Sequence, residues 1–120
     1  MVLFLVPLMS QARLAGSLKF KPPASVASAA KRGLSLRAEH GRGGTSVGLG
    51  RGKQLASGEA IGIDTLKKMH SYLARHEVDK QGEGWGEGSN GQIAWDLWGG
   101  DSAKSWVSGL RDRLIKSGDW

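Results

Sequence analysis

Apolar side chains recur at helical spacing through most of the chain beyond residue 22. The clearest stripe has intervals of three and four residues and consists of Leu66, Met69, Leu73 and His76. This spacing places side chains on one face of an α-helix. Gly62 is suited to cap the helix, and Asp64 in the first turn faces the positive end of the helix dipole. We therefore predict a central helix over residues 63–77.

Two helices are predicted upstream of this stripe. The Ala-rich segment 24–40 follows Pro22-Pro23, and proline is well tolerated in the first turn of a helix. A shorter helix should run from a Thr45 cap to Ser57 and end at Gly58, because glycine most often adopts the left-handed conformation that follows a helix. Since this second segment is rich in glycine, it should form only when packed against the rest of the domain.

The downstream part alternates between glycine-rich and apolar segments. Residues 79–91 contain five glycines among thirteen residues and no hydrophobic period, which predicts a long loop. Residues 92–98 then predict a short helical turn, which Gly99-Gly100 ends. Asp101 is expected to cap the last helix, because aspartate is a favoured N-cap residue. No run alternates with a period of two, so no strand is predicted.

The pattern as a whole predicts an all-α fold of four to five short helices around the helix over residues 63–77. Residues 22–120 should form a single small domain, and residues 1–21 an extended arm that begins with an apolar leader. The expected core side chains are Leu66, Met69, Leu73, Trp95, Trp98, Trp106 and Leu110.

Charge divides the chain into two halves. Residues 1–60 carry nine Lys and Arg against two acidic residues, whereas residues 61–120 carry eight against nine. A basic half is typical of a surface that meets nucleic acid or an acidic protein, although a merely soluble surface has the same composition. The chain has no cysteine, which excludes disulfides, thiol catalysis and cysteine-based zinc sites and is typical of a reducing cytoplasm.

The first nine residues are almost entirely apolar. A membrane-spanning helix needs about 20 apolar residues, so we predict no span here. Two interpretations remain: the leader docks in a hydrophobic groove of a partner, or translation begins at Met9. The candidate partner-binding residues are Leu3, Phe4, Leu5, Lys19, Lys21, Trp85 and Trp120. Trp85 is the leading candidate for an exposed anchor, because tryptophan is enriched at interface hot spots and this one lies in a loop.

Two segments match enzyme motifs in part, but each lacks residues that its motif requires. Residues 48–54 resemble a phosphate-binding loop, but Val47 and Gln54 stand where that motif needs glycine and a hydroxyl. Close packing of a glycine-faced helix is the better interpretation. His76-Glu77 resembles the start of a metalloprotease motif, but Lys80 occupies the place of the second histidine.

A calcium loop is also incomplete. Residues 79–90 place oxygen-bearing side chains around Gly84, but the twelfth position is Asn90 instead of the bidentate glutamate that calcium loops use. No nucleophile with a neighbouring base and no paired carboxylates can be argued from the spacing. We therefore predict a protein that is not an enzyme and has no cofactor and no metal.

A basic surface offers an alternative function. Arginine and glycine alternate around residues 41–44 and 50–53, a composition that can track phosphates without reading bases. If the first two helices pair, they could bring together Arg32, Arg37, Arg42, Arg51 and Lys53. Binding of DNA by such a surface would weaken steeply with salt.

Two strings of residues resemble a small module encoded by bacteriophages. Residues 74–80 read Ala-Arg-His-Glu-Val-Asp-Lys, and residues 93–101 read Ile-Ala-Trp-Asp-Leu-Trp-Gly-Gly-Asp. Upstream, residues 37–48 and 55–58 also fit, so the resemblance covers about residues 22–110. This chain departs from the pattern in its shorter loop after Trp85 and in its apolar leader.

The resemblance implies a setting more than a chemistry. Such modules occur among phage head and tail genes, and a short free-standing version looks like a small virion protein of short-tailed phages that infect cyanobacteria. It implies a structural component of the particle, present in multiple copies, that binds other virion proteins of the portal, tail or capsid. The expected location is the virion, and the host cytoplasm during assembly.

Overall fold

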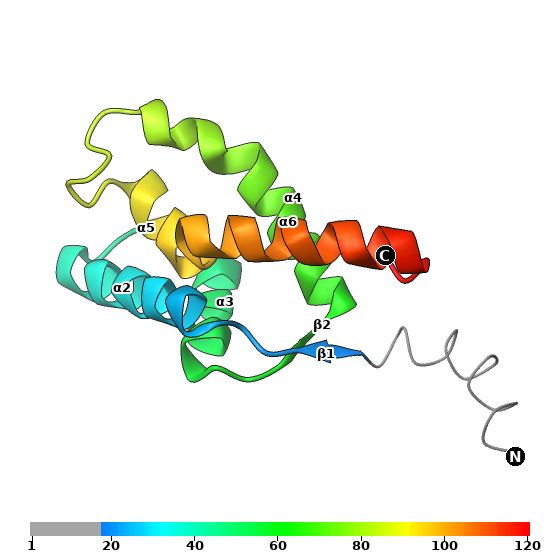
Figure 1. Cartoon of the computed structure of the whole chain (residues 1–120). Coiled ribbons are helices and arrows are strands. Elements are labelled where there is room, and N and C mark those ends of the chain that lie inside the picture. Colours follow the sequence, from blue (N-terminus) through cyan, green and yellow to red (C-terminus); the bar gives the residue numbers. More distant parts are fainter. Residues whose placement is uncertain (1–17) are drawn as a thin grey trace, which may run out of the picture.

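The computed structural model describes residues 18–120, which form a helical bundle with one very short sheet (Figure 1). The predicted apolar leader, including Leu3, Phe4 and Leu5, lies outside the described residues. The helices are α2 (Ala24–His40), α3 (Ser46–Ser57), α4 (Ile63–His76), α5 (Asn90–Leu97) and α6 (Gly100–Ser117), and the strands are β1 (Lys19–Phe20) and β2 (Ile61–Gly62). The predicted all-α class is confirmed. None of the helices in this range is long and apolar enough to cross a bilayer.

The ends of the upstream helices agree with the prediction. The Thr45 hydroxyl accepts a hydrogen bond from the Gly48 amide at 3.1 Å and so caps α3. Gly58 closes that helix in the left-handed conformation with φ of 76°, and Gly41 closes α2 in the same way. These turns need glycine because a side chain is strained at positive φ.

The prediction that the chain has no strand is wrong. Lys19 pairs with Gly62 and Phe20 with Ile61 in an antiparallel register. Each strand has only two residues, which is too short to produce an alternating pattern. The pairing joins the end of the predicted arm to the start of α4, and Leu18 packs against the core.

Two further boundaries differ from the prediction. A 3-10 helix (Glu77–Gln81) continues α4 beyond its last residue, and α5 begins at Asn90 with Ser89 as its cap, so the irregular loop is shorter than predicted. Asp101 is not the cap of α6, because this helix begins one residue earlier, after Gly99 in the left-handed conformation. Asp101 lies in the first turn, where its carboxylate is free to reach other partners.

The core lies around α5, which contacts every other helix. Six of the seven predicted core side chains are buried: Leu66, Met69, Leu73, Trp95, Trp98 and Leu110. Trp106 is the exception, because the neighbouring Val107 takes the inward position and Trp106 is only partly buried against the core. Trp106 and Val107 are both compatible with the helical spacing of the apolar residues of α6.

Glycines allow α2 and α3 to approach α5 closely. A Cβ atom on Gly33 would lie 2.6 Å from the Leu97 amide nitrogen and 2.9 Å from the Asp96 carbonyl carbon. A Cβ atom on Gly52 would lie 2.6 Å from the Leu97 side chain. Gly50, by contrast, points into open space. Close helix packing therefore explains Gly33 and Gly52 but not every glycine of α3.

Replacing Gly33 by alanine should destabilise the fold. The new methyl group meets backbone atoms, which cannot rotate away, so the free energy of unfolding should fall by about 1–3 kcal/mol or more. Gly50→Ala is the matched control and should raise it by up to about 1 kcal/mol, because alanine is the better helix former. Urea unfolding followed by tryptophan fluorescence measures both. Equal stability of Gly33→Ala and the wild type would contradict the close approach.

Candidate interaction site

The two strings that carry the phage resemblance lie against each other in space. Lys80 Nζ is 2.5 Å from Asp101 Oδ1 and 5.1 Å from the centre of the Trp95 ring. The Trp95 indole nitrogen donates to the same carboxylate at 2.9 Å. A second ion pair, between Glu77 and Lys104, joins the 3-10 helix to α6. These contacts explain several of the string residues as links between the end of α4 and the α5–α6 unit.

The environment of Asp101 favours its charged form. The hydrogen bond from Lys80 is the largest cause that lowers its pKa, and the Trp95 indole and the charge of Lys104 act in the same direction against partial burial. The carboxylate that had been expected to cap α6 is therefore held as an anion between two cations and an indole.

An aromatic stack continues the same junction on the other side of α5. The Tyr72 ring is stacked with Trp98 and with His76, with ring centres 4.4 Å apart in both cases. His76 Nδ1 in turn lies 3.2 Å from an Asp79 carboxylate oxygen. Burial raises the pKa of Tyr72 to about 12, so its hydroxyl stays protonated at neutral pH. These aromatic faces are used for packing.

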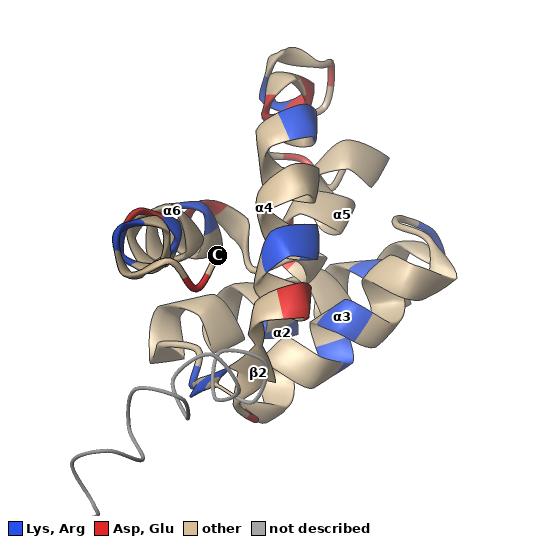
Figure 2. Ribbon diagram, turned by 90° about the vertical axis from the view of Figure 1, so that its right-hand side faces the viewer, with Lys and Arg blue, Asp and Glu red and all other residues tan. Residues whose placement is uncertain are grey.

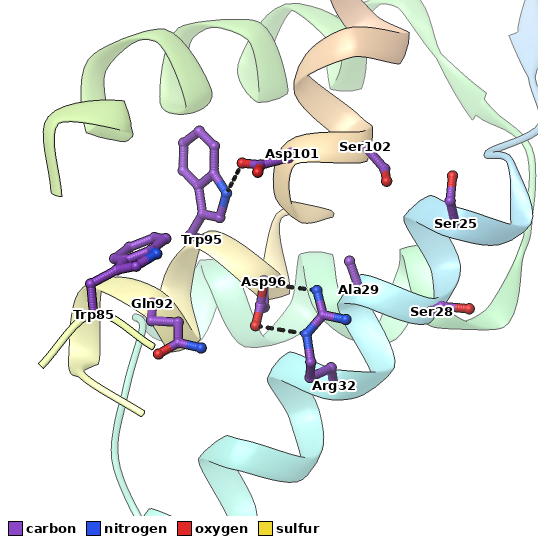
Figure 3. Close-up of a pocket in the computed structure, with 10 residues that line it drawn as sticks. All are labelled: Ser25, Ser28, Ala29, Arg32, Trp85, Gln92, Trp95, Asp96, Asp101 and Ser102. Carbon is purple, nitrogen blue, oxygen red and sulfur yellow. Dashed lines mark hydrogen bonds and ion pairs between the residues drawn. The ribbon is translucent and has the colours of Figure 1, made fainter. Parts of the chain in front are cut away.

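A cleft of about 450 Å³ opens between α2, α5 and α6 (Figure 3). Its floor holds Asp96, which is only 5% exposed and accepts two hydrogen bonds from the Arg32 guanidinium, at 3.2 and 3.3 Å. This pair raises the pKa of Arg32. Its lining includes three serine hydroxyls and no histidine. Because its two carboxylates each have a cation as partner, the charges of the cleft are nearly balanced.

Trp85 forms part of the wall of this cleft. Its ring packs edge-on against Trp95, with centres 6.3 Å apart, and it is partly buried. Trp85 is therefore less exposed than expected, and its role as an anchor for a partner stays a prediction.

A second depression, which we call the α3–α4 groove, has a volume of about 450 Å³. Its lining consists of Val47, Lys67, Lys68, Ser71, Tyr72, Arg75 and Trp98. Figure 2 shows the neighbouring helices α3 and α4 with several basic positions, one acidic position near the start of α4 and further acidic positions in the segment after it. Val47 is 62% exposed although it is apolar. Lys67, Lys68 and Arg75 form no ion pair with any residue of 18–120.

Much of the predicted nucleic-acid surface is engaged within the protein. Arg32 binds Asp96, as described above, and Arg42 donates to the Gly88 carbonyl at 3.1 Å and to the Asn90 side chain at 2.6 Å. Arg37, Arg51 and Lys53 complete the set of five residues proposed for that role. The open basic patch expected from their sequence positions is thus reduced.

Arg51 is partly buried over the Trp98 ring, 5.3 Å from its centre, and donates to Gln54. Burial lowers its pKa. Arg37 is partly buried as well, and Lys53 is exposed. Lys67, Lys68 and Arg75 of α4 are also exposed and form no ion pair in the described chain, and they were not among the residues expected to bind nucleic acid. Helical periodicity alone cannot show that another helix makes a groove beside them.

The remaining predicted partner residues have modest contacts. Lys19 is exposed on β1, and Lys21 donates to the Gly58 carbonyl at 3.3 Å. Trp120 folds back on the bundle, with the charged groups of Lys67 and Arg111 each 5.8 Å from its ring centre. A partner-binding role for these residues stays a prediction.

Comparisons of the chain with protein-family models, curated proteins and solved structures return no match. In residues 18–120, no three His, Asp or Glu side chains come together in a way that could hold a metal ion. The interpretation of the site therefore depends on its own geometry, and the α3–α4 groove is a concave surface that gathers three exposed cations without an ion pair in the described chain.

Replacing Asp101 by asparagine should remove a pH-dependent contribution to stability. The folded-state pKa is below the ordinary value of 3.8, so the contribution is complete above that value and is lost as pH falls through the folded-state pKa. At neutral pH the variant should be less stable by up to about 1 kcal/mol, since the ion pair is largely exposed and asparagine can still accept from Trp95.

The measurement is urea unfolding of both proteins from neutral to acidic pH. The difference between wild type and Asp101→Asn should shrink as the solution becomes more acidic. Asp112→Asn, at an exposed position of α6 without an ion pair in the described chain, is the control and should show almost no difference at any pH. If the difference in free energy of unfolding between Asp101→Asn and the wild type did not change with pH, the lowered pKa of Asp101 would be contradicted.

Proposed function

We propose that the protein is a non-enzymatic structural component of a bacteriophage particle that binds other virion proteins. The setting comes from the resemblance of residues 74–80 and 93–101 to a phage module. The α3–α4 groove is the observation that carries the binding role, because it combines exposed Val47 with three cations that lack an ion-pair partner in the described chain. A concave surface with unpaired charges of one sign can steer and orient a protein segment of opposite charge.

The contacts within the two strings support this interpretation. Lys80, Trp95 and Asp101 hold the elements together, and Tyr72, His76 and Trp98 form a stack. Residues in such roles maintain a fold and take no part in chemistry on a substrate. The resemblance therefore implies a shared scaffold, and surfaces such as the groove would determine what each version of the scaffold binds.

A nucleic-acid role has weaker support. The bases of single-stranded nucleic acid stack on free aromatic side chains of the proteins that bind them. Tyr72 already stacks with two neighbouring rings. Lys67 and Arg75 are eight residues apart on one helix, a separation of about 12 Å. That length can meet only a few phosphates. A partner at the portal and tail region or a capsid protein fits a groove of this size better.

Mass spectrometry of gradient-purified phage particles tests the proposal. We expect peptides of this protein in a fixed ratio to the portal, tail or capsid proteins, because a structural component has a defined number of copies. Lysate of infected cells, analysed in parallel, controls for expression. Presence in the lysate and absence from purified particles would refute the proposal and would make binding to nucleic acid at two salt concentrations the next measurement.

A further inference from the structure

The segment between the 3-10 helix and α5 carries an acidic surface of defined shape. We call residues 82–89 the acidic loop; in Figure 1 it lies at one end of the molecule, between α4 and α5. It contains Glu83 and Glu87 on either side of Trp85 and no Lys or Arg. Both glutamates are exposed and form no ion pair with any residue of 18–120.

Hydrogen bonds hold this loop in place despite its glycines. The Gln92 side-chain oxygen accepts from the Gly86 amide at 2.8 Å and from the Gly88 amide at 2.9 Å. Arg42 binds the Gly88 carbonyl, and Trp85 packs on Trp95. Glu83 and Glu87 therefore extend from a preorganised turn, which lowers the conformational entropy lost when they bind a partner.

The α3–α4 groove and the acidic loop have complementary chemistry. Lys68 and Arg75 stand at separate places along the groove, with exposed Val47 among its lining. Glu83 and Glu87 flank Trp85, which is only partly buried. Each surface thus combines an apolar group with charges of one sign, and the signs are opposite. No described residue of the same chain neutralises either set of charges.

We propose that the acidic loop of one copy of the protein docks in the α3–α4 groove of a second copy. This inference deepens the proposed function and rests on it, because a contact between like subunits would assemble several copies of a particle component into one unit. The two surfaces are different, so the contact is heterologous. After the first contact each end of the pair still has one free surface, and association continues to a ring or a filament.

The second copy is favoured over other acidic occupants by what this chain contains. Each copy of the chain carries one groove and one preformed acidic loop of opposite charge, so the two surfaces are present in equal numbers. Nucleic acid would match the cations but would leave Val47 without an apolar partner. Contacts between exposed charges are individually weak, so association should depend on protein concentration and should weaken as salt is added.

Charge reversal on each surface tests the proposal with the full-length protein after nuclease treatment. The groove variant is Lys68→Glu with Arg75→Glu, and the loop variant is Glu83→Lys with Glu87→Lys. Sedimentation analysis at increasing concentration should show oligomers for the wild type. Each variant alone should associate at least about tenfold more weakly, because its groove and loop now carry the same charge. An equal mixture of the two variants should regain oligomers that contain both chains.

Matched variants separate a docking contact from a general effect of charge or stability. The double variant Lys31→Glu with Lys116→Glu changes the net charge by the same amount as the groove variant, but at exposed positions outside the groove. It should leave association unchanged. Val47→Ser should weaken association, whereas Ile115→Ser, at an exposed apolar position on α6, should not. Circular dichroism of every variant checks that the helices are intact.

Several results would overturn the inference. These are a wild type that remains monomeric at every concentration, oligomers that disappear on nuclease treatment, association unaffected by either reversal, and a mixture that fails to regain oligomers. Particle analysis keeps this outcome separate from the proposed function. A protein found in virions but monomeric in solution would refute the docking contact alone, and an oligomer absent from virions would refute the particle role.

Discussion

The close approach of α5 to the glycine-lined faces of α2 and α3 is the constraint on which the rest of the structure depends. Gly33, Gly44 and Gly52 each leave the space that Leu97 occupies, and a methyl group at any of them would overlap it. With α5 fixed at this depth, Trp95 within the helix and Trp98 directly after it are directed to different sides. Trp95 reaches the junction with Lys80 and Asp101, and Trp98 forms a wall of the α3–α4 groove. Both candidate surfaces therefore depend on contacts made by residues without side chains.

Local signals were sufficient to predict most helices and most of the core. The cap at Thr45, the glycine ends and the stripe of α4 are all produced within a few residues of sequence, where steric and hydrogen-bonding preferences act directly. The features that differ depend on distant residues. The two short strands pair although α2 and α3 separate them in the sequence. Asp101 turns toward a lysine of another element. Trp106 and Val107 both fitted the inner face of α6, and only packing decides between them.

The candidate site was less predictable than the fold. The basic residues of the N-terminal half looked available because their charges are not balanced locally, but Arg32 pairs with an acid 64 residues away. A buried carboxylate needs such a partner, because an unpaired charge in the interior is strongly unfavourable. The lysines of α4 have ordinary helical spacing in the sequence, and nothing in a helical stripe shows that a neighbouring helix begins beside it. Net charge thus predicted the type of surface but not its place.

The dependence of α2 and α3 on Leu97 also has a consequence for the order of synthesis. The ribosome completes α3 about 40 residues before Leu97 is added, which corresponds to a few seconds at usual elongation rates. During that interval the glycine-lined faces lack the Leu97 side chain, and the first two helices can pack only on each other. The nascent N-terminal half should therefore remain loosely structured until α5 is made. Folding of the whole domain would then follow release of its C-terminal part from the exit tunnel.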